Sequence, residues 1–441
     1  MPAFQFKVEL RQQTPLIHFQ HRQEGACLRA SEVKPKLDAF LKARFEERLS
    51  SFYISGTVAL DYKMRVEAEG DAERSTTIEA ALLKIDGRAT NQDKLKQNIN
   101  DNNRIIICRS YFGNMVSGEN DNEKKQNINE MFKETVFYIS PIGLIFFCRY
   151  PDLSKLIKEN IALFFLLYNF GTRQNKGFGS FKVTEIDGAP VTRDAFDLLK
   201  EGYKPTYQYL YKYKYNEPQT CANGNSHQAQ MEAAACIYQL MKSGKNYEDK
   251  KSNRNMQAKI PKYKRAYIFK HMQSQDKNIG NEKAWMKQNG IAPVVCDPKR
   301  QACAEHLPPY TYKKYRYVRA MLGLTDEQRY FACWDKVQNK AAGRKNIKIS
   351  HVAGTIKRFP SPVFFKIVDN CLFILANEPA DDMYCQEFEF DGLKRGTLMT
   401  PNKEEFSMKT FLSEFSADFL TLKDAFPSLP NGVKLEEVAC P

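Results

Sequence analysis

The sequence predicts an α+β fold organised as two domains, and three observations support this. Its 441 residues are more than one ordinary hydrophobic core organises, so two domains are the default expectation. Segments with apolar residues at every second position, typical of strands, alternate with segments whose apolar residues recur every three or four positions, typical of helices. The basic excess lies in one part of the chain, which indicates a polyanionic partner.

The first 200 residues carry the elements of a ferredoxin-like split βαβ unit, which is also the RNA-recognition fold. Ser31 is the predicted N-cap of the first helix, and Pro35 is expected in its first turn, where a missing N–H is tolerated. The expected elements are strands within 4–10, 56–70, 135–150 and 179–188, and helices within 31–49 and 154–170. A polar excursion is expected at 70–103, followed by a strand at 104–114.

The second half predicts another sheet with a long insertion. Tyrosines alternate over 207–215 and share one face of an expected strand, and strand character returns over 349–375. Residues 227–345 are expected to be mostly helix and loop, and 409–422 a closing helix. The predicted domains are 1–200, with a glycine-rich loop at 171–180, and 201–441, with a helical, basic insertion at about 222–345.

The net charge of +14 comes from a single segment. Residues 241–360 contain 27 Lys and Arg against 9 Asp and Glu, whereas the rest of the chain contains 39 against 43. Within it, "KYKRAYIFK" and "YTYKKYRYVRA" interleave tyrosines with cations, a composition that neutralises phosphates and stacks on unpaired bases. A solvated lysine-rich surface over buried tyrosines is the alternative explanation.

Other features narrow the class of protein. No apolar run reaches the length of a membrane span, and the N-terminus lacks the pattern of a secretory signal. Eleven scattered cysteines favour reduced thiols in a cytoplasmic protein. Cys296, Cys303 and His306 lack a CxxC pair and a fourth ligand, so neither a metal nor a cofactor is expected.

The stretch "NFGTRQNKGFGSF", residues 169–181, is the strongest local motif. It lacks the Gly-Lys-Ser/Thr end of a Walker A loop, and it leads from a helix into a strand, the reverse of a dinucleotide fingerprint. Its backbone N–H groups are candidates for cradling phosphates, with Arg173 and Lys176 supplying charge and Phe178 stacking on a base. A tight turn that uses glycines for positive φ remains the alternative.

Three more segments carry residues suited to contact with RNA. Cations surround the start of the first helix, where free N–H groups and the helix dipole favour anions, although a capped helix with ordinary lysines would look the same. His18 and His21 follow the first strand, and either general acid–base cleavage of RNA or simple hydrogen bonding and stacking fits them. "GTIKRFPSPVFFKI" places Lys357 and Arg358 just before a buried strand.

Three of these stretches together resemble the RAMP superfamily of CRISPR-associated proteins: "TPLIHFQ" with "GACLRASEVKPKLDAFL", then "FGTRQNKGFGSF", then "RFPSPVFFKI". The layout is most similar to the first RAMP subunit of the type III-B Cmr effector complex. The resemblance implies two ferredoxin-like domains and a non-catalytic RNA-binding subunit. Such a subunit would hold the 3′ region of the CRISPR RNA, the paired target RNA, or both, beside other RAMP subunits, with no small-molecule substrate and no membrane.

The motifs and the resemblance together define a predicted RNA-binding set. A CRISPR-RNA processing endoribonuclease with His18 or His21 as general acid or base is the alternative function. Processing enzymes of the superfamily usually carry the glycine loop near the C-terminus, whereas about 260 residues follow it here. The predicted set is His18, Arg22, Arg29, Ser31, Lys34, Lys36, Gly171, Thr172, Arg173, Gln174, Lys176, Gly177, Phe178, Gly179, Ser180, Lys313, Lys314, Arg316, Lys357 and Arg358.

Overall fold

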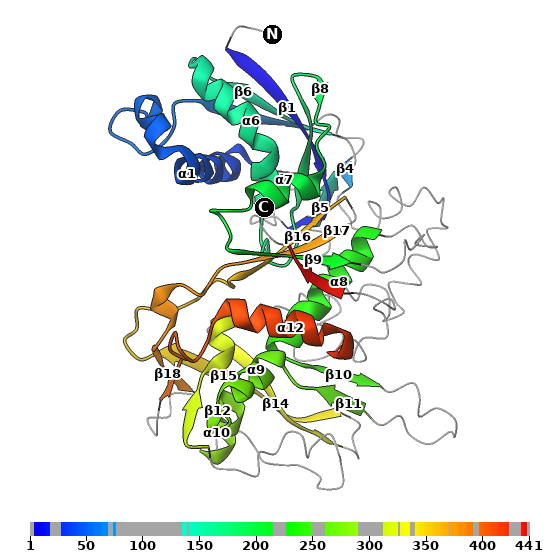
Figure 1. Cartoon of the computed structure of the whole chain (residues 1–441), viewed down its shortest axis with the longest axis vertical. Helices are drawn as coiled ribbons and strands as arrows, with labels where there is room; N and C mark the ends of the chain where they lie inside the picture. The colour runs from blue at the N-terminus through cyan, green and yellow to red at the C-terminus, as the bar shows by residue number, and fades with distance from the viewer. Residues whose placement is uncertain are drawn as a thin grey trace, which may run out of the picture. The chain divides into compact units, whose positions relative to one another are not determined.

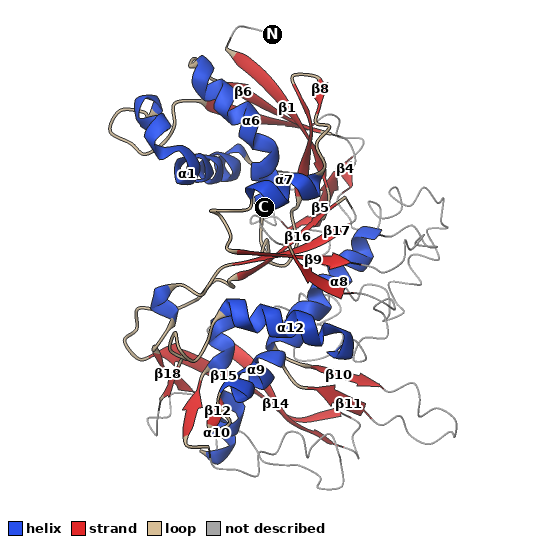
Figure 2. Cartoon of the chain, viewed as in Figure 1, coloured by secondary structure: helices blue, strands red, loops and turns tan. Residues whose placement is uncertain are grey.

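The computed structural model assigns the chain to two units, each assembled from separate stretches of sequence (Figures 1 and 2). The first unit comprises Met1–Ala235, Phe364–Leu375 and Glu436–Pro441, and the second comprises Cys236–Val363 and Ala376–Leu435. The structure describes residues 4–17, 28–68, 74–75, 135–138, 141–214, 226–248, 261–289, 312–324, 327–335, 340–369, 371–390, 397–422 and 434–438.

The first unit is built on an antiparallel sheet with the strand order β3-β6-β1-β7-β8. Along the chain, its elements run β1, α1, β3, β6, α6, β7, which is the order of a split βαβ unit. The bounds are β1 Gln5–Gln12, α1 Ala30–Leu49, β3 Lys63–Ala68, β6 Ile142–Phe147, α6 Pro151–Leu167, β7 Phe181–Ile186 and β8 Ala189–Pro190. Strands are therefore confirmed within 4–10, 56–70, 135–150 and 179–188, and helices over most of 31–49 and 154–170.

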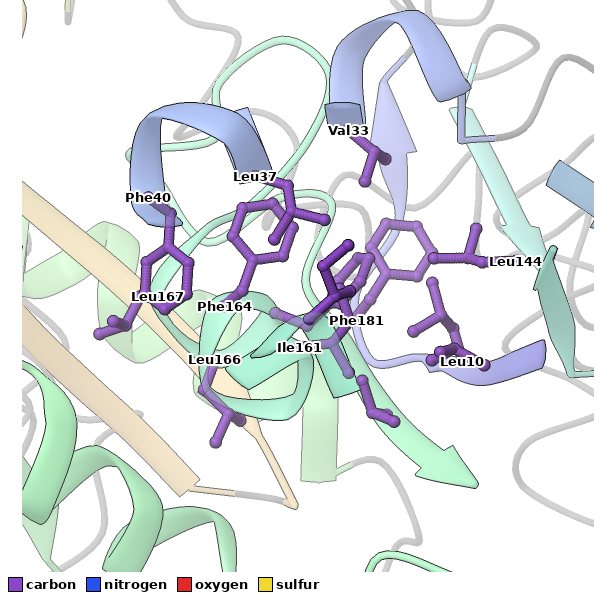
Figure 3. Close-up of a cluster of buried hydrophobic side chains, with 14 of the residues drawn as sticks. Leu10, Val33, Leu37, Phe40, Leu144, Ile161, Phe164, Leu166, Leu167 and Phe181 are labelled. Atoms are coloured by element: carbon purple, nitrogen blue, oxygen red, sulfur yellow. The ribbon is translucent and has the colours of Figure 1, made fainter. Parts of the chain in front are cut away.

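Side-chain patterning explains why these segments pack as they do. Alternate residues of β1 are buried, and α6 begins with Pro151 at a position where its missing N–H is harmless. Helices α1 and α6 lie on the same side of the sheet (Figure 1). Their apolar stripes meet the sheet in one core, where Val33, Phe40 and Phe164 approach Leu10 and Leu144 (Figure 3).

The start of α1 differs from the expectation. The carbonyl of Arg29 accepts hydrogen bonds from the N–H groups of Glu32 and Val33, so the helix begins at Ala30 and Arg29 is the N-cap residue. The prediction of Ser31 as N-cap is therefore wrong. Pro35 consequently lies in the second turn of the helix, two residues further from the N-cap than expected.

A second sheet, ordered β16-β17-β9-β20, brings the C-terminal part of the chain into the first unit. Its strands are β16 Val363–Val368, β17 Cys371–Ala376, β9 Tyr209–Lys214 and β20 Lys434–Glu437. Tyr209, Tyr211 and Tyr213 occupy alternate positions of β9 and so share one face as expected, with Tyr211 and Tyr213 buried. The remaining elements are η1 Ser50–Phe52, α7 Ala195–Gly202 and a small sheet of β2 Leu16–Ile17, β5 Thr135–Tyr138 and β4 Arg74–Ser75.

The second unit mixes helices with short strands around a core that includes Trp285, Tyr317 and Phe388. Residues 227–345, expected to be mostly helix and loop, also form strands β10 to β15. The helices are α8 Ser226–Lys242, α9 Tyr267–Gln275, α10 Glu282–Gln288, η4 Val318–Leu322, η5 Asp381–Met383 and α12 Met408–Leu422. The strands are β10 Lys245–Glu248, β11 Pro261–Lys264, β12 Ile279–Asn281, β13 Lys314–Arg316, β14 Glu327–Asp335, β15 Lys340–His351, β18 Glu387–Phe390 and β19 Leu398–Met399.

The architecture is thus a mixed α/β fold with several antiparallel sheets. The second ferredoxin-like domain and the boundary after residue 200 stay predictions. The strand expected at 104–114 lies outside the described residues. Among the helices of the described stretches, none has the length and apolar character needed to cross a bilayer.

Candidate nucleic-acid interface

The glycine loop, residues 171–180, connects α6 to β7 and is fastened first to the end of β1. The hydroxyl of Thr14 donates to the carbonyl of Gly177 at 2.6 Å and accepts from the N–H of Ser180 at 2.9 Å. The N–H of Gly179 donates to the carbonyl of Pro15 at 2.8 Å. The Thr-Pro-Leu stretch therefore serves as the support on which the loop is folded.

The start of α1 fastens the other end of the loop. Glu32 Oε1 accepts from the N–H of Gly171 at 2.9 Å and from Lys36 Nζ at 3.0 Å. Lys36 Nζ also donates to the Asn169 carbonyl at 3.0 Å and to Gln174 Oε1 at 2.9 Å. All three protons of this ammonium are engaged, and a carboxylate lies where the sequence suggested a phosphate.

Strand β16 provides a third set of hydrogen bonds to the loop. Ser180 Oγ donates to the carbonyl of Ile367 at 2.7 Å, and the N–H of Phe365 donates to the carbonyl of Asn175 at 3.3 Å. Between them, Lys366 is fully buried and its Nζ reaches backbone carbonyls on both sides of the loop. The three stretches that carried the family resemblance thus meet at one place in the first unit.

Two of the glycines are required by this packing. Gly171 has φ of +79°, and a Cβ there would lie 2.5 Å from the Ile17 carbonyl oxygen. Gly179 has φ of +67°, and its Cβ would lie 1.9 Å from the Phe170 carbonyl oxygen. No side chain fits at either position, so the glycines permit a close crossing of backbones.

The expectation of a bare N–H cradle for phosphates needs correction. The backbone N–H groups of Gly171, Thr172, Gly177, Gly179 and Ser180 all donate to atoms within the protein, because the loop packs tightly against its supports. Phe178 is fully buried, so its ring contributes to the interior and presents no face for stacking on a base.

The outer part of the loop has a different character. Thr172, Arg173 and Gln174 are half-buried, and Arg173 adopts a φ of +56°, a conformation that non-glycine residues rarely take. The Nζ atom of Lys176 is itself buried. Near the start of α1, Arg29 is half-buried and Ser31 exposed. The outer part of the loop and the start of α1 therefore present polar side chains, whereas most backbone N–H groups of the loop are already used.

Lys34 does not join the loop. Its Nζ donates to Asp38 Oδ2 at 2.8 Å and to the Leu60 carbonyl at 2.9 Å, and it lies 4.2 Å from the centre of the Tyr62 ring. These contacts tie α1 to the segment before β3. Lys34 thus has a structural role that its position in the motif did not reveal.

The predicted cations of the second unit fall into two groups. Lys314 Nζ lies 2.9 Å from Glu405 Oε1, and Arg316 makes a two-pronged contact with the same carboxylate at 2.7 and 3.0 Å. Burial would raise the pKa of Glu405, but the hydrogen bonds from Arg316 and Lys314 outweigh this and hold it below its ordinary value. Lys313, Lys357 and Arg358 have exposed side chains.

Several candidates lie outside the described residues: His18, His21 and Arg22, as well as Cys296, Cys303 and His306. Glu32 and Lys366 are the most informative residues whose roles the sequence did not predict. The one local signal is that Lys366 interrupts the apolar run "VFFKIV", which marks the residue as unusual but does not show what it contacts.

Comparisons with known proteins agree with the motifs. The model of the Cmr1 N-terminal domain matches residues 3–245 and that of the Cmr1 C-terminal domain matches residues 263–425. No curated protein matches.

Two solved structures are similar. A chain from a cryo-EM structure of the type III-B Cmr-beta complex bound to cognate target RNA is 10% identical, with 85% of this chain and 94% of that chain covered and a TM-score of 0.36. The crystal structure of apo Cmr1 from Pyrococcus furiosus is 9% identical, with 99% of both chains covered and a TM-score of 0.33. The first family model alone spans more than half of the sequence, and the chain therefore belongs to the Cmr1 family.

Proposed function

We propose that this protein is a non-catalytic RNA-binding subunit of a type III-B CRISPR effector ribonucleoprotein. Its partners are the CRISPR RNA, the target RNA and other RAMP subunits, in the cytoplasm. It holds the 3′ region of the CRISPR RNA, the paired target RNA, or both. Family membership supports the assembly, and the resemblance of the three motif stretches supports the contact with RNA.

The observation that carries this proposal is the convergence of those stretches on the glycine loop. Three segments distant in sequence hold a ten-residue loop in one conformation through backbone and side-chain hydrogen bonds. The loop is thereby organised before any ligand arrives, which lowers the entropy lost on binding. Thr172, Arg173 and Gln174 on its outer part, with Arg29 and Ser31, offer hydroxyls, an amide and cations to a ribose-phosphate backbone.

The direct test is a salt titration of binding by the full chain to a labelled single-stranded RNA. Contact with phosphates releases counterions, so the logarithm of the association constant should fall linearly with the logarithm of salt concentration. An affinity that does not change between low and high salt would rule out this mode of RNA binding.

One observation motivates a test of the nuclease alternative. Ile17, whose carbonyl accepts the N–H of Thr172 at 2.8 Å, immediately precedes His18 in the chain. Incubation of CRISPR repeat RNA with the wild type and with His18→Ala separates the two functions. Specific cleavage by the wild type that disappears in the variant establishes the nuclease, whereas intact RNA in both supports the binding subunit.

A further inference from the structure

Lys366 is an unusual residue to find in the middle of a strand. All six residues of β16 are buried, and Lys366 has no exposed surface at all. Its Nζ lies 2.6 Å from the Phe165 carbonyl and 3.1 Å from the Tyr168 carbonyl. Lysines are almost never fully buried unless they are paired, and the hydrogen-bond partners of this ammonium in the described structure are neutral oxygens.

The position of those oxygens explains why an ammonium is kept there. Phe165 and Tyr168 form the C-terminal end of α6, where carbonyls lack partners within the helix and the dipole is negative. Burial lowers the pKa of Lys366 well below its ordinary range. The lysine is nevertheless suited to this position, because the carbonyl oxygens around its Nζ atom need N–H donors. An apolar residue of the same length would leave these carbonyls buried without donors.

The contacts of Lys366 continue into the glycine loop. Its Nζ also reaches Asn169 Oδ1 at 3.1 Å, and Asn169 Nδ2 donates to the carbonyls of Gln174 at 2.8 Å and Phe365 at 3.0 Å. Because Lys366 occupies the amide oxygen, it fixes which way the Asn169 side chain points. The Gln174 carbonyl belongs to the outer part of the loop, next to Arg173.

From these contacts we propose that Lys366 is the positioning residue of the glycine loop: through Asn169 it holds the outer residues of the loop in the arrangement that contacts RNA. This rests on the proposed function and adds a residue to it. Lys366 itself touches no ligand. It acts by joining the end of α6, the middle of the loop and strand β16 at one buried point.

The test compares Lys366→Met with Val368→Ala in the full chain. Val368 lies on the same strand, is equally buried and belongs to the hydrophobic core cluster, so its truncation controls for loss of stability. Two quantities are measured: hydrogen exchange of the segment 169–181, and affinity for a labelled single-stranded RNA as a function of salt.

Lys366→Met should accelerate exchange in the loop by about tenfold or more and weaken RNA binding by about tenfold. Val368→Ala should leave both at the wild-type level. Unchanged exchange in Lys366→Met overturns the proposal, and so does accelerated exchange with full RNA affinity. If the wild type binds no RNA, the proposed function fails, and exchange alone decides whether Lys366 positions the loop.

Asn169→Ala provides a second route if Lys366→Met does not fold. It retains the ammonium and removes only the side chain that links Lys366 to Gln174. We expect faster exchange around Gln174 and weaker RNA binding, both smaller in size than for Lys366→Met. Wild-type hydrogen exchange and RNA affinity in Asn169→Ala would show that Asn169 does not connect Lys366 to the loop.

Discussion

The glycine loop of the first unit and the basic segment of the second, residues 241–360, were both expected to bind RNA, and they are built in opposite ways. Beside the loop, the buried Lys366 of β16 is held by the neutral carbonyls of Phe165 and Tyr168. In the basic segment, Lys314 and Arg316 share the Glu405 carboxylate. Net charge counted along a sequence therefore overstates the charge available to a polyanion, because it does not show which cations are already neutralised.

The largest expected effect concerns the close crossing of two backbones at the glycine loop. Gly179→Ala would place a Cβ 1.9 Å from the Phe170 carbonyl oxygen, so two backbones must separate. We expect a loss of about 3 kcal/mol or more in the free energy of unfolding of the first unit. Thermal unfolding followed by circular dichroism measures it.

Gly56→Ala is the matched control, since Gly56 also has a positive φ, +75°, but nothing lies within 4 Å of an added Cβ. Its cost should be limited to the left-handed backbone, about 1 kcal/mol. Equal losses for the two variants would show that the close crossing at Gly179 has no energetic weight.

A second prediction concerns the ion pairs that Lys314 and Arg316 of the basic segment form with Glu405. Glu405→Gln removes the carboxylate that Arg316 and Lys314 share, with an expected loss of about 2 kcal/mol at pH 7. The folded pKa of Glu405 is depressed, so its stabilisation is present above the ordinary value of 4.5 and disappears as the pH falls through the folded pKa.

Urea unfolding followed by tryptophan fluorescence measures this loss, since both tryptophans, Trp285 and Trp334, belong to the second unit. The difference between wild type and variant should shrink on acidification below pH 4.5. A difference that stays constant with pH would assign the effect to packing rather than to charge.

A third prediction sharpens the comparison, because one cation of the second unit also donates to backbone carbonyls, as Lys366 does. Lys242 is half-buried and donates to the carbonyls of Leu322 and Gly323, and desolvation, followed by the nearby Arg319, lowers its pKa to about 7. The unfolded state binds more protons between this value and 10.5, so the unfolding free energy should rise with pH across that window.

The slope for this one group is at most about 1.4 kcal/mol per pH unit. Lys242→Met should remove that contribution, so the gap between the two unfolding curves should change steadily from pH 7 to pH 10. Parallel curves would show that Lys242 does not titrate in this range.

The sequence predicted most of the first unit because its signals are local. Alternation in β1, the apolar face of α6 and the glycines of the loop are each visible within a short window. The roles of Glu32 and Lys366 were not predictable, since they depend on contacts with residues more than 130 positions away. Phe178 was misjudged for the same reason, because its burial is a property of the folded chain, and so is the pairing of Arg316 with Glu405, which the sequence did not reveal.

The central claim, that the outer face of the glycine loop contacts RNA, is tested most directly at Arg173. Its φ of +56° is tolerated by asparagine, so Arg173→Asn removes the charge with little strain, and Arg173→Glu reverses it. Lys155→Glu is the control, because Lys155 is exposed in the first turns of α6, about 20 Å from the loop by helix length.

The measurement is the affinity of each full-length variant for guide RNA across a salt series. We predict that Arg173→Glu weakens binding by about tenfold or more and reduces the salt slope by about one, with Arg173→Asn intermediate and Lys155→Glu unchanged. Wild-type affinity and slope in Arg173→Glu would show that the loop is only a turn and that the RNA-binding surface lies elsewhere.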